Sequence, residues 1–187
     1  GVRELVLIAQ DSTCYGLDLY GRREIAKLLR EVSRVDGIEW IRLMYAFPSG
    51  FPEDLLEEIA VNPKVCKYLD IPVQHVSDRV LASMRRGITS EGLRTLIGKI
   101  RAAVPGIALR TTLIAGYPAE GEREFDELLE FVRETEFDIT VELGSPWTMI
   151  DASFFAFALL QVTPRLNRAL ICTVPAPPLA VSPVSVN

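Results

Sequence analysis

Three apolar segments of this chain each end in polar side chains, and a segment with helical periodicity follows each of them. The three segments cover residues 4–11, 67–75 and 107–116. A strand, a polar tip and a helix in succession form the repeating unit of parallel α/β proteins, in which ligands bind at the carboxyl ends of the strands. We therefore expect a parallel sheet with a ligand site at the polar tips.

The periodicities predict alternating strands and helices along most of the chain. Strands are expected at 4–11, 38–47, 65–73, 107–115 and 137–143, and helices at 20–35, 52–62, 78–86, 90–104 and 122–135. Successive units of this kind imply right-handed crossovers and a parallel sheet.

Two architectures satisfy this order: a sheet curled into a partial (β/α) barrel, and an open, doubly wound sheet. Side chains alternate between the two faces of a strand, so Asp70 and Gln74 share one face of the third strand. Arg110 and Thr112 share one face of the fourth strand in the same way. Because polar faces of this kind converge inside a barrel, we favour the partial (β/α) barrel with parallel strands.

The chain changes character near residue 140. Helical and strand periodicities fade there, and residues 173–187 contain so much proline that regular pairing is prevented. We therefore expect a partial barrel at 1–143 and a divergent C-terminal tail at 144–187, extended or disordered toward its end.

The composition is that of one globular domain, with 187 residues, 49% hydrophobic and 24% charged. A formal net charge of -5 argues against a surface that binds nucleic acid through bulk charge, so no direct nucleic-acid binding is expected. The apolar stretch at 152–160 is too short to span a bilayer, so no membrane association is expected. The three cysteines suit neither a disulfide framework nor a local metal site, which favours a cytoplasmic location; they are Cys14, Cys66 and Cys172.

Arg110 lies within a strand that is otherwise apolar enough to be buried. A buried guanidinium requires a carboxylate partner, which either the protein or a ligand can supply. Asp70 is the protein group that fits, and the carboxylate of a bound ligand is the alternative. The sequence leaves both pairings open, and different states of one protein can use each of them.

Polar residues gather where the predicted strands end. Gln10 and Asp11 end the first strand, and Gln74 and His75 end the third. Barrel enzymes project ligand-binding groups from these positions. His75 is the only histidine of the chain and cannot define a metal site by itself, so no metal ligands are assigned.

Two further features extend this set of candidates. The loop at 116–121 begins and ends with glycine, which lets backbone approach a ligand, and its Glu120 can accept hydrogen bonds from ribose hydroxyls or simply favour the following helix start. Arg85 and Arg86 form a local basic pair that can meet a phosphate or an acidic partner. We treat these two arginines and His75 as candidates for substrate contact and assign no catalytic residue.

Three sequence blocks, taken together, resemble a known family. They are IAQDSTCYG at 8–16, DIPVQHVSDRVLASMRRG at 70–87 and RTTLIAGYP at 110–118. In this order they are similar to the radical S-adenosylmethionine methylthiotransferases, and they look more like the RimO branch than the tRNA-modifying MiaB branch. The resemblance covers most of residues 1–138.

The resemblance implies a radical reaction in which a [4Fe-4S] cluster cleaves S-adenosylmethionine reductively. The electron for this cleavage comes from an electron donor, which would be a further partner. The RimO branch adds a methylthio group to the β-carbon of an aspartate in a ribosomal small-subunit protein, which would be the protein partner. The resemblance makes Arg110 the group that meets the cofactor carboxylate, and Glu120 or Asp11 the group that meets its ribose or amino group. The residues implied in cofactor binding are Gln10, Asp11, Gln74, Arg110 and Glu120.

The chain departs from the family in three places. The Cys-x-x-x-Cys-x-x-Cys loop that holds the cluster is absent, and the three scattered cysteines cannot reproduce it. The resemblance thus places the first barrel strand and the cluster ligands outside this chain and implies that the isolated chain is inactive. Residues 140–187 lack the family's continuation, and Ala119 and Gly121 replace its usual Gly and Thr.

Two other functions fit the predicted scaffold. One is a noncatalytic α/β module that docks a ribosomal or other protein partner, in which the polar strand ends are structural. The other is a metal-dependent aldolase-like barrel, which ranks last because the chain lacks a set of histidine and carboxylate ligands.

Overall fold

The computed structural model describes residues 1–144 of the chain. The elements, in chain order, are β1 (Glu4–Leu7), the 3₁₀ turn η1 (Ser12–Cys14), α1 (Leu17–Tyr20), α2 (Ile25–Ser33), β2 (Trp40–Leu43), α3 (Glu53–Val61), β3 (Tyr68–Asp70), α4 (Asp78–Ser83), α5 (Ser90–Ala103), β4 (Ala108–Ala115), α6 (Glu122–Thr135) and β5 (Ile139–Gly144). The tail expected beyond residue 144, with Cys172, lies outside the described residues.

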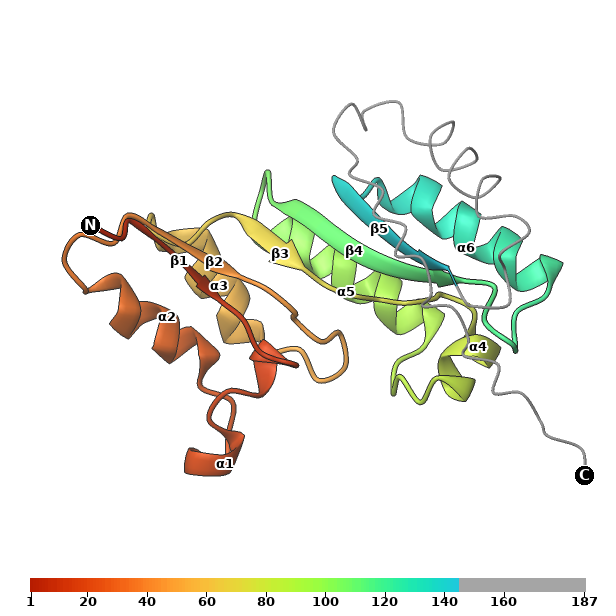
Figure 1. The fold of residues 1–187 in the computed structure, drawn as a ribbon, viewed down its shortest axis with the longest axis horizontal. Coiled ribbons are helices and arrows are strands. Elements are labelled where there is room, and N and C mark those ends of the chain that lie inside the picture. The colour runs from red at the N-terminus through yellow and green to blue at the C-terminus, as the bar shows by residue number, and fades with distance from the viewer. Residues whose placement is uncertain (145–187) are drawn as a thin grey trace, which may run out of the picture.

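All pairs of neighbouring strands are parallel. β1 pairs with β2, and β3, β4 and β5 pair in chain order with Asp70 opposite Arg110. An isolated parallel bridge between Ile41 and Val65 joins the two sheets. The prediction of a parallel α/β fold is confirmed. The strands of residues 1–144 form an open arc without closing, which agrees with a partial barrel (Figure 1).

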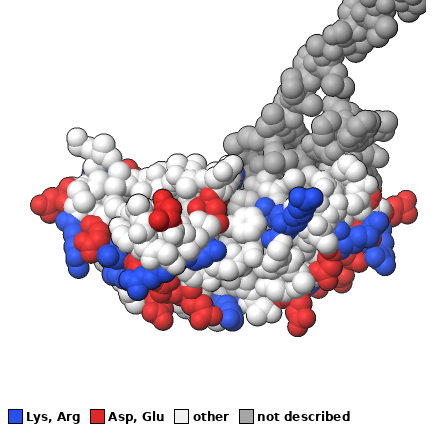
Figure 2. All heavy atoms as spheres, turned by 90° about the horizontal axis from the view of Figure 1, so that it is seen from below, with Lys and Arg blue, Asp and Glu red and all other residues white. Residues whose placement is uncertain are grey.

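One face of the strands is covered by helices. Helices α3 and α5 lie behind the strands in Figure 1, and this side is convex in the edge-on view of Figure 2. Helix α2 packs against α3 on the same side. Ile41, Leu43, Leu109 and Leu113 point to this side and are at most 1% exposed. Burial of each such side chain contributes about 1.5–3 kcal/mol. They join one core with helical side chains that include Leu29, Leu55, Leu93, Ile100, Leu128 and Phe131.

The face of the molecule that Figure 2 shows has no dominant sign of charge. Lysine and arginine side chains alternate with aspartate and glutamate side chains on the face that Figure 2 shows. None of the helices in residues 1–144 combines the length and the apolarity needed to cross a membrane.

The two longest helices follow the predicted ranges because their starts are well specified. The Thr89 hydroxyl accepts a hydrogen bond from the Gly92 N–H at 3.1 Å and caps α5. The Glu124 carboxylate accepts from the Gly121 N–H at 3.0 Å at the start of α6. Observed α5 and α6 therefore agree with the expected 90–104 and 122–135.

The helix expected at 20–35 is split in the structure. Gly21 adopts a left-handed φ of 67° and ends the short α1. The longer helix, α2, then begins only at Ile25. The amphipathic pattern is present, but the left-handed residue interrupts the chain of helical hydrogen bonds.

Several strands are also shorter than expected. β2 ends at Leu43, and Tyr45 just beyond it has a left-handed φ of 56°. β3 ends at Asp70, before Pro72, which has no N–H to donate to a strand neighbour. The helix expected at 78–86 ends at Ser83, close to a second left-handed residue, Arg85, with φ 55°.

Candidate functional site

The face of the sheet that α2, α3 and α5 leave uncovered carries an ion pair between neighbouring strands. Arg110 Nη1 of β4 donates to Asp70 Oδ1 of β3 at 2.6 Å. The Asp70 side chain is fully buried, whereas the Arg110 side chain keeps 21% of its surface exposed. The predicted protein partner of Arg110 is therefore confirmed. Because a guanidinium has several N–H donors in a fixed fork, Arg110 retains donors for a second carboxylate.

A second charged contact lies on the same face. Arg42 of β2 donates from Nε to Glu4 Oε1 of β1 at 2.9 Å, and its guanidinium carbon lies 5.0 Å from the centre of the Tyr68 ring. Burial, and then the nearby Asp70 carboxylate, raise the pKa of Tyr68. Arg42 and Glu4 were not among the site residues predicted from the sequence. The alternation of Arg42 with the buried residues of β2 was the signal that would have found it.

The Asp11 carboxylate is used by the turn that follows β1. Its Oδ1 accepts from the Thr13 N–H at 2.9 Å and from the Thr13 hydroxyl at 2.6 Å, and its Oδ2 accepts from Cys14 Sγ at 2.8 Å. Partial burial raises the pKa of Asp11, but these hydrogen bonds outweigh burial and leave the pKa below its ordinary value. Asp11 thus caps η1 in the segment that follows β1, and the preceding residue, Gln10, lies exposed.

Gln74 lies four residues beyond the end of β3, in an isolated parallel bridge with Leu113, and its conformation is strained. Its φ is 71°, although its N–H donates to the Thr112 carbonyl at 2.9 Å and its carbonyl accepts from the Ile114 N–H at 2.8 Å. The side-chain Oε1 is buried without a hydrogen-bond partner. A left-handed glutamine held by backbone bonds, with an unused buried acceptor, is typical of a ligand-binding edge.

His75 and Glu120 lie side by side. The His75 side chain is completely buried, and its Nδ1 accepts from the Ser77 N–H at 3.0 Å. The other ring nitrogen, Nε2, lies 3.5 Å from Glu120 Oε2. That oxygen also accepts from the Gly116 N–H at 2.9 Å. The structure thus joins the segment after β3 to the loop after β4 through two predicted site residues.

Arg85 and Arg86 occupy different environments. Arg85 is exposed, lies just beyond the end of α4 and has a φ of 55°. Arg86 donates from Nη2 to the Pro72 carbonyl, and its guanidinium carbon lies 4.3 Å from the centre of the Phe47 ring. Its Nε is buried without a partner, and burial lowers the pKa of this side chain. Arg86 therefore packs under the strand ends, while Arg85 faces the solvent.

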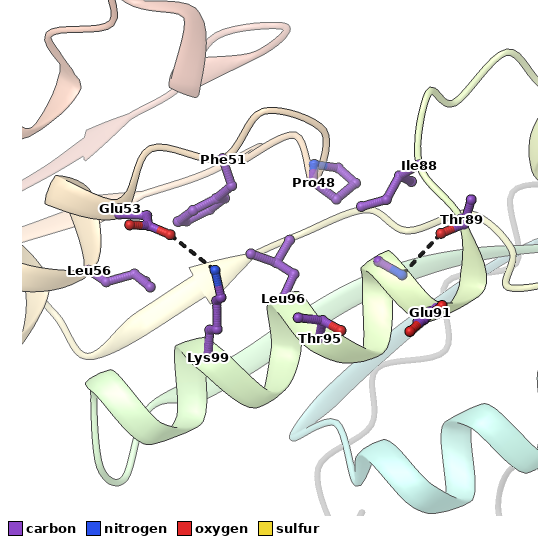
Figure 3. Close-up of a pocket in the computed structure, with 11 residues that line it drawn as sticks. Pro48, Phe51, Glu53, Leu56, Ile88, Thr89, Glu91, Thr95, Leu96 and Lys99 are labelled. Atoms are coloured by element: carbon purple, nitrogen blue, oxygen red, sulfur yellow. Dashed lines mark hydrogen bonds and ion pairs between the residues drawn. The ribbon is translucent and has the colours of Figure 1, made fainter.

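A groove of about 420 Å³ lies elsewhere, between α3 and α5 (Figure 3). Lys99 of α5 reaches Glu53 at the start of α3 with 3.0 Å between Nζ and Oε1, and Phe51 and Leu96 supply apolar walls. None of the site residues predicted from the sequence lines this groove. The strand ends and the groove are therefore separate features of the molecule.

The described residues contain no group of three or more histidine, cysteine or acidic side chains arranged to hold a metal ion. Cys14 in η1 and Cys66 before β3 are both free thiols. Two cysteines on separate elements do not fit an iron–sulfur cluster, which requires several thiolates around one metal centre.

Comparison with known proteins agrees with this architecture. Residues 1–132 match the family model described as the radical SAM superfamily. The chain is 58% identical over 138 residues to ribosomal protein uS12 methylthiotransferase RimO of Flavobacterium psychrophilum, an alignment covering 74% of this chain and 32% of that protein. The chain therefore spans about a third of the length of the curated relatives it matches.

Two solved structures share the fold. Coproporphyrinogen III oxidase (HemN) from Escherichia coli, described as a radical SAM enzyme, superposes with a TM-score of 0.58 at 17% identity, covering 74% of this chain and 36% of that one. The methyltransferase TsrM from Kitasatospora setae gives a TM-score of 0.57 at 18% identity, covering 74% of this chain and 27% of that one. At this identity the likeness concerns the fold alone. The curated relatives do not favour the noncatalytic or aldolase-like alternatives.

Proposed function

Because the chain belongs to the radical SAM superfamily, we propose that it forms the central barrel portion of a methylthiotransferase of the RimO type. The reaction is the transfer of a methylthio group to the β-carbon of an aspartate in a ribosomal small-subunit protein, and the relatives' name points to uS12. The observation that carries the proposal is the 58% identity over 138 residues, which is 74% of this chain. An electron donor is a further partner in this proposal, and the protein acts without contacting nucleic acid directly.

S-adenosylmethionine is the ligand that we assign to the strand ends. Arg110 meets its carboxylate with the N–H donors that Asp70 does not use, and Gln74 offers an unpartnered buried oxygen. Gln10 lies exposed in the segment that follows β1. Asp11 and Glu120 lie in loops that border this ligand. Each carboxylate accepts a backbone hydrogen bond within its own loop, from the Thr13 N–H and the Gly116 N–H, and so fixes the shape of that loop. When bound, S-adenosylmethionine supplies the precursor of the radical and carbon groups that are activated by its sulfonium sulfur.

The two described cysteines, Cys14 and Cys66, do not fit a [4Fe-4S] cluster. We assign no step of radical formation to the residues of this chain. The proposal is therefore that the isolated chain binds S-adenosylmethionine weakly and does not cleave it. Weak binding is expected because, in family members that carry the cluster, an iron of the cluster contributes part of the affinity for S-adenosylmethionine.

Calorimetric titration of the isolated chain with S-adenosylmethionine tests the assignment. We expect a Kd of about 0.1–1 mM for the unmodified chain and loss of at least about tenfold in affinity for Arg110→Ala. Arg133→Ala, which changes an exposed arginine of α6, is the matched control and should bind as the parent does. Equal heats for the parent and Arg110→Ala would contradict the proposal.

A second variant guards against a trivial loss of folding. Arg110→Ala leaves the buried Asp70 carboxylate unpaired, which is destabilising. Arg110→Gln combined with Asp70→Asn removes both charges together. If this pair folds and still fails to bind, the loss of affinity belongs to the missing guanidinium.

A further inference from the structure

His75 can carry its ring proton at only one nitrogen in this structure. The Ser77 N–H points at Nδ1 from 3.0 Å, so Nδ1 is the acceptor and carries no hydrogen. The neutral ring therefore has its proton on Nε2. That nitrogen is buried, lacks a hydrogen-bond partner and faces Glu120 Oε2 across 3.5 Å.

Glu120 Oε2 in turn organises the loop after β4. It accepts from the Gly116 N–H at 2.9 Å and from the Tyr117 N–H at 3.3 Å, and the Glu120 side chain is only 6% exposed. Gly116 has a left-handed φ of 73°, so this loop turns sharply where it leaves the strand. One carboxylate oxygen thus gathers two backbone N–H groups and faces a third donor from another strand end.

We propose that His75 is a positioning residue that acts through Glu120. Its Nε2–H holds the Glu120 carboxylate in place, and the carboxylate fixes the shape of the loop at 116–121. The complete burial of His75 means that it reaches a ligand only through this loop. The ligand part of the inference rests on the proposed function, in which the loop borders bound S-adenosylmethionine. The 3.5 Å separation shortens to a hydrogen bond when the ligand presses the loop toward β3, as polar contacts in ligand-free sites commonly do.

Nitrogen NMR of the chain tests the tautomer directly. His75 is the only histidine, so the imidazole signals of a ¹⁵N-labelled sample are unambiguous. We expect the proton on Nε2 at neutral pH and a change in the Nε2 signal in Glu120→Gln. A proton on Nδ1, or an Nε2 signal that Glu120→Gln leaves unchanged, would overturn the proposal.

Variants of His75 test the effect on the loop. His75→Leu removes both ring contacts, whereas His75→Gln keeps an amide donor that can reach Glu120. Amide hydrogen exchange at Gly116 and Tyr117 should become roughly tenfold faster in His75→Leu and recover in His75→Gln. Exchange that stays the same at both amides in a folded His75→Leu would contradict the proposal. If His75→Leu does not fold, the exchange rates of Glu120→Gln and the parent decide the question.

Affinity for S-adenosylmethionine tests the effect of His75 on ligand binding separately from its contact with Glu120. His75→Leu should bind about tenfold more weakly than the parent, and His75→Gln should bind within about twofold of it. Equal affinity in all three proteins would refute the positioning role. If the parent itself does not bind S-adenosylmethionine, the proposed function and the ligand role of His75 both fail, while the tautomer and the exchange rates still decide the contact with Glu120.

Discussion

Arg110 on β4 and Asp70 on β3 face each other across adjacent parallel strands, with 2.6 Å between Nη1 and Oδ1. Asp70 is completely buried and also lies 3.4 Å from the Tyr45 N–H, so its charge is compensated from two sides. Arg110 remains partly exposed on the side where a ligand would enter. The pair therefore supplies both internal compensation and a basic group for an incoming carboxylate.

Loss of Arg110 alone should be more harmful to stability than loss of both charges. Arg110→Ala leaves a buried carboxylate and should lower the free energy of unfolding by about 3 kcal/mol. The double variant Arg110→Gln with Asp70→Asn should lose less than half of that. Urea unfolding of the parent, of Arg110→Gln, of Asp70→Asn and of the double variant gives the coupling energy. Additive effects of the two single variants would show that the contact carries no stabilisation.

Acid should weaken the start of α6 through Glu124. The hydrogen bond from Arg79, and then the Gly121 N–H, lower the pKa of Glu124 from its usual 4.5 to about 2. A carboxyl group whose pKa falls on folding stabilises the folded state above pH about 4.5, and this contribution is lost as pH falls toward about 2. Glu124→Gln should therefore be less stable than the parent at neutral pH, and the difference should shrink through this window.

Urea midpoints of the parent and Glu124→Gln across that pH range check this expectation. Glu130→Gln, an exposed position on the same helix, is the matched control and should follow the parent at every pH. A gap between the parent and Glu124→Gln that does not change with pH would count against the ionic origin of the contribution.

Cys14 should react slowly with alkylating reagents. Its hydrogen bond to Asp11, and then burial, raise the pKa of the Cys14 thiol, which reduces the thiolate available for reaction. Asp11→Asn removes the negative charge and should speed alkylation of Cys14 several-fold near neutral pH. Peptide mass spectrometry after timed iodoacetamide treatment measures this, with Cys66 as the internal reference. An unchanged ratio of Cys14 to Cys66 labelling would argue against control by Asp11.

Glycine at position 74 should stabilise the fold and weaken binding. Gln74 has a φ of 71°, which costs a non-glycine residue about 1 kcal/mol. Gln74→Gly should raise the free energy of unfolding by about that amount and lower affinity for S-adenosylmethionine. Glu136→Gly relieves a similar φ of 47° at the end of α6 and is the control that should gain stability without losing affinity. Loss of affinity in both variants would contradict a ligand role for Gln74.

The sequence predicted those parts of the fold that local rules determine. Helix α5 and strand β4 appear almost as expected, because a capping threonine and a proline–glycine turn specify their ends. The pairing of Arg110 with Asp70 was one of the two pairings that the sequence left open, since a charged residue in an apolar strand requires a partner from the protein or from a ligand. These features depend on periodicity, turn chemistry and the cost of burying charge.

Other features depended on tertiary packing and could not be predicted locally. Nothing in the sequence distinguishes Gln74 or Tyr45 as left-handed, because both are held there by bonds to neighbouring strands and loops. The engagement of Asp11 with Thr13 and Cys14 likewise depends on the turn geometry that forms in three dimensions. The contact of His75 with Glu120 joins residues far apart in the chain and needs the parallel register of β3 and β4.

The bridge between Ile41 and Val65 is a weaker connection than the strand pairing within the three-stranded sheet. At this bridge Ile41 N–H donates to the Lys64 carbonyl at 2.7 Å, and Cys66 N–H donates to the Ile41 carbonyl at 2.9 Å. Beyond β2, one further backbone bond runs from Ala46 N–H to the Asp70 carbonyl at 2.8 Å. β4 and β5, by contrast, are paired over six consecutive positions, from Arg110–Ile139 to Ala115–Gly144. A short seam of this kind is where a cooperative unit comes apart first. Under applied force or thermal fluctuation, β1, β2 and α2 should therefore separate as one unit while the three-stranded sheet stays folded.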